Sequence, residues 1–367
     1  MRRGLIARST VELPDAVLEA RLARVHGAMR RGGFEALLLY TNNTRPAGVS
    51  WLTGFVPYWS EALLVLVADR PPVLVAALTY RVKSWIERTS RLGDVSHTPH
   101  VGIEAARMIA PSRSDAAVAV PDLAGMPAGI AADLRAGGLK LTDASDMFAQ
   151  LRAPADPAEV ALAVKAASIA HHALAQAPGK SIAERIAGVE GTARGLGAEE
   201  IYIAAAPDLA RDCRFQRIEG EAALGATFAL RATVAYRGTW IRLVRTFGAP
   251  AQMEEAMSRF AAAVAELPRD GALRGFSSWL VEGCRVAQPL EPLMGSRLEE
   301  AVGVLPRSIV SVQASLTIGG RPVLVGAPAL IGDAGEAASL LINPAFAAQA
   351  GSSASRDPAY RDECWVS

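Results

Sequence analysis

The sequence predicts an α/β protein of two domains, the second of them α+β in character. The chain has 367 residues, more than one compact core usually organises. Short apolar runs alternate with helical patterns up to about residue 150, and paired strand patterns dominate after residue 200. With 51% hydrophobic and 20% charged residues, the composition supplies a sizeable core and argues against disorder as the main state.

The first domain is expected over residues 1–152. An amphipathic helix is predicted at residues 15–31, because Leu18, Leu22, Val25 and Met29 recur every three or four positions before Gly32-Gly33. Apolar runs predict buried strands at residues 36–40, 62–68, 72–78 and 116–120, with a polar helix at about residues 79–91.

The second domain is expected over residues 153–350, and a small, polar tail at 351–367 is typical of a mobile segment or a surface strap. Two prolines open an alanine-rich helix that extends to about residue 177. Ser181 and Glu184 have the spacing of a capping box for a helix at 181–196. Further strands are predicted at 200–205, 227–236, 239–247, 308–318 and 322–325, with a hairpin at Arg237-Gly238 and helices at 251–267 and 273–287.

The charge balance and the rare residue types exclude several classes of function. Lys+Arg (38) and Asp+Glu (37) nearly cancel, which argues against a dedicated nucleic-acid binder. No apolar run is long enough to cross a membrane, and the start lacks a secretory pattern, so a cytoplasmic location is expected. The last lysine is Lys180 and the last histidine is His172, so the C-terminal half holds neither a Schiff-base lysine nor an imidazole base. The cysteines form no CxxC pair and no disulfide framework.

Six phrases stand in order along the chain, at residues 21–37, 51–55 (WLTGF), 151–159, 236–247 (YRGTW and RTF), 305–313 and 333–336 (DAGE). Together they resemble the creatinase / Xaa-Pro aminopeptidase / prolidase superfamily, whose catalytic domain has the pita-bread fold. The resemblance implies a small N-terminal creatinase-type α/β domain, a pita-bread domain after it, and a homodimer.

The chemistry of this family normally uses two divalent metal ions held by two aspartates, one histidine and two glutamates. At the corresponding positions this chain has residues that are poor ligands. A guanidinium cannot bind a cation, and an apolar residue offers no donor atom. We therefore expect no metal, no cofactor and no metallopeptidase activity. The metal-free mechanism of creatinase needs a histidine that this C-terminal half lacks. The resemblance places the five family ligand positions, in chain order, on Arg231, Arg242, Pro292 or Leu293, Gln313 and Gly326.

Two interpretations of Arg231 and Arg242 stay open. With Gln313 they could bind an anionic substrate, because the planar fork of an arginine suits a carboxylate or a phosphate. Alternatively, they form ion pairs with neighbouring acids and fill a disused pocket. Burying two arginines is costly without counter-charge, so an anion is expected between them. The candidates are a ligand or one of Asp208, Asp212, Glu299 and Glu300.

Glu299 and Glu300 lie near the His-Glu pair of the family, and a carboxylate in a closed cavity can transfer protons if its pKa is raised. A surface helix turn is the alternative. Asp212 and Arg214 fall near a substrate-facing histidine of the family and are candidates for substrate contact, and Cys213 between them is either an activated thiol or an unreactive one.

Other chemistry-bearing residues have plainer interpretations. His171 and His172 are adjacent on a helix and diverge by about 100°, so they cannot chelate one metal ion together. Cys284 is expected in the core of an apolar helix. Tyr58, Trp59 and Glu61 either pack or line the entrance of a partner subunit's site.

The sequence thus predicts a metal-independent enzyme that acts on a small amino-acid-like or carboxylate-bearing molecule, for instance in specialised metabolism. Glu299 and Glu300 would be catalytic, and Arg231, Arg242, Gln313, Asp212 and Arg214 would bind the substrate. The alternative is a non-catalytic pseudopeptidase that serves as a ligand-binding or scaffold homodimer. Both hypotheses have a small anionic molecule as the partner, and neither involves nucleic acid or a membrane.

Overall fold

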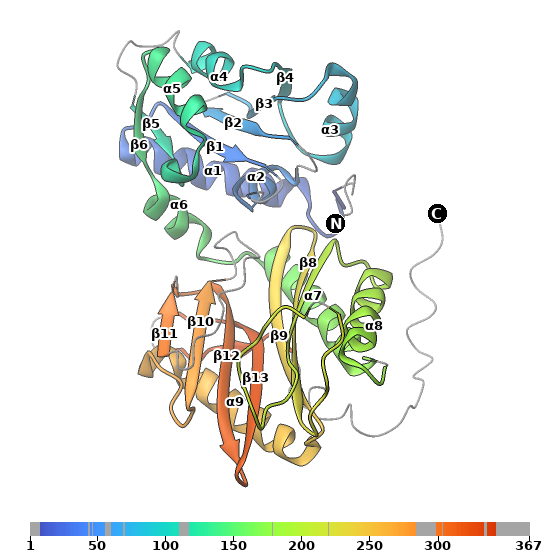
Figure 1. The fold of residues 1–367 in the computed structure, drawn as a ribbon. Helices are drawn as coiled ribbons and strands as arrows, with labels where there is room; N and C mark the ends of the chain where they lie inside the picture. Colours follow the sequence, from blue (N-terminus) through green and yellow to red (C-terminus); the bar gives the residue numbers. More distant parts are fainter. Residues whose placement is uncertain are drawn as a thin grey trace.

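The computed structural model describes residues 8–42, 45, 47–55, 60–68, 70–109, 117–177, 179–218, 220–283, 299–302, 304–333 and 336–342. Several sequence expectations lie outside these residues: Tyr58, Trp59, Cys284, Pro292 or Leu293, and the tail at 351–367. Two sheets, each with its own helices, lie one above the other and are joined through α6 and α7 (Figure 1). Within the described residues, no helix combines the length and apolar character needed to cross a membrane.

The N-terminal sheet has six strands in the order β4-β3-β2-β1-β5-β6. One hydrophobic cluster packs its first face against α1, α2, α3 and α6, and a second cluster packs the other face against α4 and α5. The strands are β1 (Ala36–Thr41), β2 (Ala62–Val67), β3 (Val73–Ala76), β4 (Asp94–His97), β5 (Ala117–Val120) and β6 (Lys140–Asp143). The helices are α1 (Asp15–Gly32), α2 (Ala47–Thr53), α3 (Lys83–Thr89), α4 (Val101–Ile109), α5 (Ala128–Ala136) and α6 (Ser145–Arg152), with 3-10 turns at Tyr80–Val82 and Leu123–Gly125.

The C-terminal sheet has eight strands, in the order β11-β10-β12-β13-β9-β8-β7, with β14 beside β13. Three helices, α7 (Pro157–Ala175), α8 (Ile182–Gly195) and α9 (Pro250–Asp270), cover one face. The strands are β7 (Glu200–Ala206), β8 (Phe228–Tyr236), β9 (Thr239–Phe247), β10 (Ser278–Gly283), β11 (Glu299–Val302), β12 (Ile309–Ile318), β13 (Arg321–Leu330) and β14 (Ser339–Leu340).

Local signals in the second domain are confirmed. The Ser181 hydroxyl accepts the Glu184 N–H at 3.2 Å, and the Glu184 carboxylate accepts the Ser181 N–H at 3.3 Å, which completes the predicted capping box. Arg237 and Gly238 have φ values of 48° and 75°, the left-handed pair that a tight hairpin between twisted strands requires.

Two predictions in this domain are wrong. Residues 273–283, the described part of the helix predicted at 273–287, do not form a helix: Ser278–Gly283 are strand β10, with Trp279 and Val281 buried against the helices. Glu299 and Glu300 do not lie on a helix turn, since they begin strand β11. Both errors fall in short segments, where an apolar strand and one turn of a buried helix have similar composition.

A buried arginine joins the two domains. Arg21 on α1 is only 3% exposed, and its guanidinium donates to both carboxylate oxygens of Asp156 at 2.7 and 3.0 Å. Asp156 is also the N-cap of α7, where it accepts the Glu159 N–H at 2.9 Å. A third bond runs from Arg21 to the carbonyl of Trp51 at 2.8 Å. One side chain therefore holds the start of α7 against the first domain.

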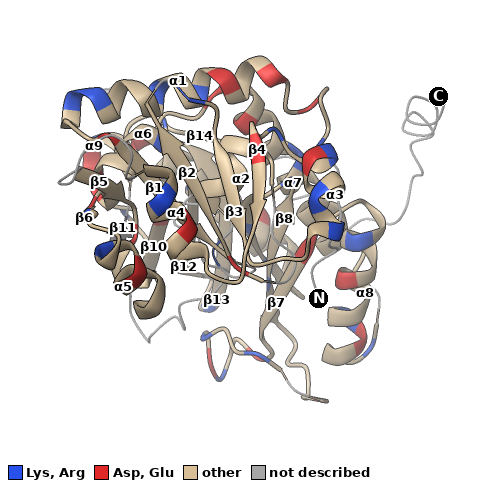
Figure 2. Ribbon diagram, turned by 90° about the horizontal axis from the view of Figure 1, so that it is seen from above, with Lys and Arg blue, Asp and Glu red and all other residues tan. Residues whose placement is uncertain are grey.

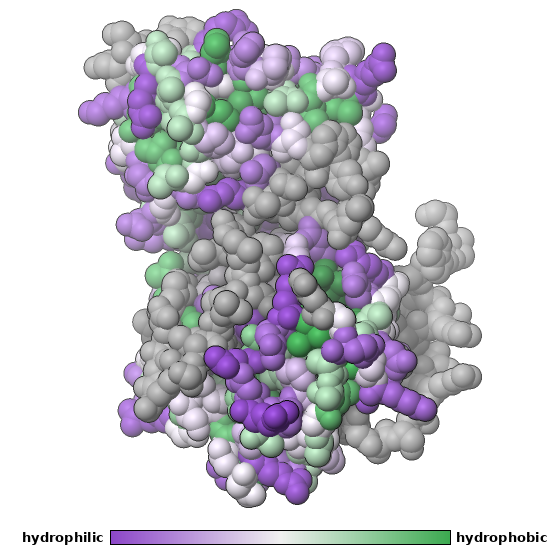
Figure 3. Space-filling model, in the orientation of Figure 1, coloured by the Kyte–Doolittle hydropathy of each residue, from purple (hydrophilic) through white to green (hydrophobic). Residues whose placement is uncertain are grey.

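The charged residues of the described surface are mixed in sign. Figure 2 marks both basic and acidic residues along α1 and along α3. On the face shown in Figure 3, the coloured residues alternate between hydrophilic and hydrophobic without one extended apolar patch.

Candidate functional site

Three of the predicted site residues, Arg231, Arg242 and Gln313, lie on the face of the C-terminal sheet opposite α7, α8 and α9, which we call the polar face. Side chains alternate between faces along each strand, so the pairing register decides which of them meet. Leu230, Leu243 and Val312 pack into the helix-side core, and Arg231, Arg242 and Gln313 therefore point the other way.

Four strands contribute to one cross-strand line on the polar face. Arg231 on β8 pairs with Val244 on β9, Val244 with Gly326 on β13, and Gly326 with Gln313 on β12. Three of the five family ligand positions predicted from the sequence thus share one line. Gln313 in turn pairs with Leu280 on β10.

Arg231 and Gln313 bond to each other from the two ends of this line. Each is only 1% exposed, and the Arg231 Nη1 donates to the Gln313 Oε1 at 3.0 Å. Phe215, from the connection between β7 and β8, covers the guanidinium with its ring centre 4.7 Å away. Arg231 is therefore held by an amide and an aromatic ring inside the protein.

Gly326 provides the space that this bond crosses. A β-carbon at Gly326 would lie 2.8 Å from the Val312 carbonyl oxygen and 3.0 Å from Val244 Cγ2. These separations are too short for ordinary packing, so the position accepts only glycine without movement of the sheet. A glutamate, which the sequence resemblance implies at this position, would not fit the present arrangement.

Arg242 lies one line further along the sheet. On one side, Arg242 pairs with Thr233. On the other side, the antiparallel register places Pro328, then Ser311 and then Glu282 along the same line. Arg242 Nη1 forms an ion pair with Glu282 Oε2 on β10. The small side chains between them leave the ion pair room to span β13 and β12. Their side chains are 10% and 24% exposed, so the ion pair is mostly shielded from solvent.

The counter-charge for Arg242 is therefore Glu282, a residue that the sequence analysis did not name. Among the described side chains, neither Asp208 nor Asp212 pairs with Arg242, and the side chains of Glu299 and Glu300 lie outside the description. The signal that could have found Glu282 is the alternation of the segment SWLVEG, which places Ser278, Leu280 and Glu282 on one face of a strand.

Two buried polar atoms on the polar face lack a partner. Within the described part of the chain, neither the Gln313 Nε2 nor the Ser311 Oγ has a hydrogen-bond partner. Their residues are 1% and 2% exposed. An unsatisfied buried donor costs roughly 1–3 kcal/mol, and native proteins keep few of them. A bound acceptor would satisfy both atoms.

A stacked aromatic pair adjoins Arg242. Tyr202 on β7 and Trp240 on β9 have ring centres 5.8 Å apart and planes inclined by 25°. Tyr202 pairs with Thr233 and so begins the Arg242 line, and Trp240 lies two residues before Arg242 on the same face of β9. Both side chains are half-buried. The sequence analysis missed this pair because stacking between strands depends on their register.

Asp212 and Arg214 pair with each other rather than with Arg231 or Arg242. Their ion pair, at 2.7 Å, is exposed, and the hydrogen bond from Arg214 lowers the pKa of Asp212. Burial, and then the charge of Asp212, raise the pKa of the Cys213 thiol. A raised pKa reduces the fraction of reactive thiolate and counts against an activated thiol. Asp208 accepts the Ala210 N–H at 3.1 Å in the same connection.

The backbone of β11 continues the Arg231 line. β11 is parallel to β10, with Glu299 opposite Trp279 and Glu300 opposite Leu280. Since Leu280 pairs with Gln313, Glu300 occupies the next register position after Gln313. The assignment of Glu299 and Glu300 as catalytic residues stays a prediction.

The donor set at the family positions does not fit a dinuclear metal centre. Divalent ions of this kind prefer carboxylate oxygens and an imidazole. The four described positions offer two guanidinium groups, a glycine and the amide of Gln313, whose oxygen already accepts from Arg231. Among the described residues, no group of three or more His, Cys, Asp or Glu side chains could hold a metal ion.

The chain has the pita-bread fold, with its N-terminal and C-terminal domains arranged as in solved dipeptidase and prolidase structures. No family model matches the sequence, and no curated protein matches it. Solved structures with the same arrangement of both domains share few identical residues with this chain, so the likeness establishes the fold.

Among these structures, dipeptidase PepE from Mycobacterium ulcerans has a TM-score of 0.61 and 19% identity over 89% of this chain and 96% of that chain. The prolidase from Pyrococcus horikoshii OT3 has a TM-score of 0.64 and 14% identity over 88% of this chain and 98% of that chain. The N-terminal domain of the FACT complex subunit SPT16 from Cicer arietinum (chickpea) has a TM-score of 0.58 and 12% identity over 91% of this chain and 97% of that chain.

Proposed function

We propose that the polar face binds a small amino-acid-like or carboxylate-bearing molecule, and that the protein acts on it without a metal ion. The observation that carries this proposal is the set of unmatched polar atoms, the Gln313 amide nitrogen and the Ser311 hydroxyl, beside two buried arginines. This cluster has more donors than acceptors, so an anion is the ligand that completes it.

Each group of the cluster has a separate role in binding. Arg231 is fixed by Phe215 and Gln313, so it orients the Gln313 amide and keeps its nitrogen directed away from the guanidinium. The ligand carboxylate accepts from this nitrogen and from Arg242. The stacked rings of Tyr202 and Trp240 offer an apolar surface beside the carboxylate site.

We assign proton transfer to Glu282, which competes with the ligand carboxylate for Arg242. In the free protein Glu282 is its partner. A ligand carboxylate that engages Arg242 releases Glu282 from its ion pair and leaves a free carboxylate beside the ligand. Glu282 then accepts or donates a proton at the ligand. Glu299 and Glu300, on the neighbouring strand, remain the further candidates for this step, as does substrate contact by Asp212 and Arg214.

A thermal-shift screen against small carboxylates, phosphates and dipeptides tests the binding. A ligand at 100-fold excess over its dissociation constant should stabilise the protein by about 2.7 kcal/mol. Gln313→Leu should abolish this response. Gln150→Leu, an exposed position on α6, is the matched control and should keep it. The proposal fails if no carboxylate stabilises the native protein, or if Gln313→Leu responds as the native protein does.

A non-catalytic ligand-binding or scaffold protein is the second candidate. It is favoured by a specific observation, namely that Arg231 and Arg242 already have partners within this chain. One protein of the same fold is described as a subunit of the FACT complex. Mass spectrometry of each stabilising ligand after prolonged incubation separates the two candidates, since an enzyme consumes the ligand and a binding protein returns it unchanged.

Both candidates retain the sequence expectations of a cytoplasmic homodimer with no cofactor and no nucleic-acid partner. Sedimentation velocity tests the dimer: a species of twice the chain mass of 38.5 kDa supports it, and a monomer at all concentrations contradicts it.

A further inference from the structure

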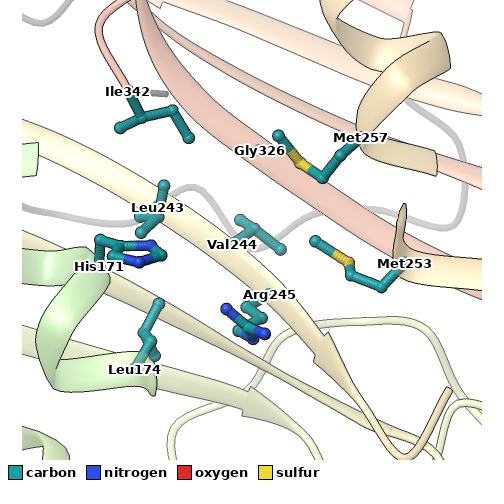
Figure 4. Close-up of a pocket in the computed structure, with 9 residues that line it drawn as sticks. All are labelled: His171, Leu174, Leu243, Val244, Arg245, Met253, Met257, Gly326 and Ile342. Carbon is teal, nitrogen blue, oxygen red and sulfur yellow. The ribbon is translucent and has the colours of Figure 1, made fainter. Parts of the chain in front are cut away.

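A small hollow lies on the opposite side of the same sheet, between the sheet and its helices. His171 and Leu174 reach it from α7, Met253 and Met257 from α9, and Arg245 from β9 (Figure 4). Leu243, Val244, Gly326 and Ile342 complete the lining. The space has room for about one water-sized group.

Arg245 is the charged group of this hollow. It alternates with Val244 along β9 and so points to the helix side of the sheet, away from Arg231 and Arg242. The residue is only 8% exposed. Within the described ranges, the Arg245 guanidinium has no hydrogen-bond acceptor and no ion-pair partner. It makes a cation–π contact with Phe247, whose ring centre is 5.7 Å away.

Among the described residues, no acidic side chain neutralises this charge. Arginine stays protonated in proteins, so the guanidinium is a cation even here. Burial lowers the pKa of Arg245, with no carboxylate acting in the other direction. The remaining side chains are apolar or sulfur-containing apart from His171. A buried cation without counter-charge costs several kcal/mol, and a bound anion removes that cost.

The size and lining of the hollow define the anion. We infer that the hollow is a binding site for one monovalent inorganic anion of about the size of chloride, which the Arg245 guanidinium holds. A phosphate or an organic carboxylate needs more space than one water-sized group. The thioethers of Met253 and Met257 are polarisable and suit a soft, weakly hydrated ion. This site is separate from the polar face, on which the proposed function depends.

Thermal unfolding in sodium chloride and in sodium gluconate, at equal ionic strength, isolates this effect from general salt screening. The native protein should show a saturable rise in melting temperature in chloride and none in gluconate. Arg245→Met keeps the length of the side chain and should lose the chloride increment. Arg259→Met removes an arginine from the exposed side of α9 and should keep it.

A second measurement locates the ion and does not depend on the variant folding. Crystals of the native protein soaked in bromide should give an anomalous peak within about 3.5 Å of the Arg245 guanidinium nitrogens, the range of a hydrogen bond to a large anion. Equal melting temperatures in chloride and gluconate, or anomalous peaks confined to the surface, overturn the inference. A chloride increment that persists in Arg245→Met overturns it as well.

Discussion

Arg231 and Gln313 are joined by a 3.0 Å hydrogen bond between strands that are three places apart in the sheet. The bond passes over Val244 and Gly326, which separate them in one cross-strand line. An ion pair between Arg242 and Glu282 crosses the next line in the same way. Two long polar contacts thus involve residues at positions that the sequence resemblance assigns to the metal ligands of the family.

Substitutions of Gln313 should rank by how well they accept from Arg231. Gln313→Leu removes the acceptor and leaves a buried guanidinium, so we expect a loss of about 1.5–3 kcal/mol. Gln313→Glu supplies a carboxylate to the same guanidinium and should be at least 1 kcal/mol more stable than Gln313→Leu, on the order of one charge-assisted bond. Urea denaturation of the three proteins measures the order, and a leucine variant as stable as the native protein would contradict it.

Arg242 and Glu282 should be strongly coupled. Arg242→Met and Glu282→Gln each leave a mostly buried charge or donor without its partner, and each should cost about 2–4 kcal/mol. The double variant should cost less than the sum, because no lone charge remains. The exposed pair of Arg214 and Asp212 is the matched control, with a coupling of about 0–1 kcal/mol. Additive losses at Arg242 and Glu282 would show that the two side chains do not interact.

Gly326 should not tolerate a methyl group. Gly326→Ala brings a β-carbon within 2.8 Å of a backbone oxygen, and overpacking of this kind costs about 1–3 kcal/mol. Gly191 lies inside α8 with open space around its β-position, so Gly191→Ala should stabilise the protein by roughly 0.5–1 kcal/mol. Thermal unfolding of both variants gives the signs, and a neutral Gly326→Ala would show that this part of the sheet moves freely.

The stability of the protein should fall in mildly acidic solution partly because of His171. Burial, and then the nearby charges of Arg245 and His172, lower the pKa of His171 from 6.5 to about 4. In the unfolded chain His171 takes up its proton near pH 6.5, whereas the folded protein resists it until about pH 4. The free energy of unfolding therefore decreases as the pH falls through this window, by up to about 3 kcal/mol.

Comparison with His171→Gln isolates this contribution from the carboxylates that titrate in the same range. The variant should lose less stability than the native protein between pH 6.5 and pH 4. His172→Gln, at the exposed neighbouring position, should keep the native slope. Identical slopes for the native protein and His171→Gln would show that His171 titrates normally.

Local sequence signals predicted much of the fold. The capping box at Ser181, the hairpin at Arg237-Gly238 and the alanine-rich α7 all depend on residues close together in the chain. The family resemblance also assigned Arg231 and Arg242 to one site, and the register places both on the polar face. The sequence failed at β10, where a six-residue strand was interpreted as part of a helix.

That failure also hid the counter-charge. Glu282 and Arg242 are 40 residues apart and meet only because β10, β12, β13 and β9 pair in that order. Phe215 covers Arg231 from a connection without regular structure, and the unmatched Ser311 hydroxyl depends on the depth of burial. None of these contacts follows from periodicity, because each requires the three-dimensional pairing of distant segments.

The side-chain NMR signal of Gln313 tests most directly whether its amide nitrogen donates to a ligand acceptor. The signal is identified by its absence in Gln313→Leu and followed while a stabilising carboxylate is titrated. We expect a saturable shift of this amide signal, with the same dissociation constant as the thermal stabilisation. A carboxylate that saturates the protein and leaves the Gln313 amide signal unchanged would contradict it.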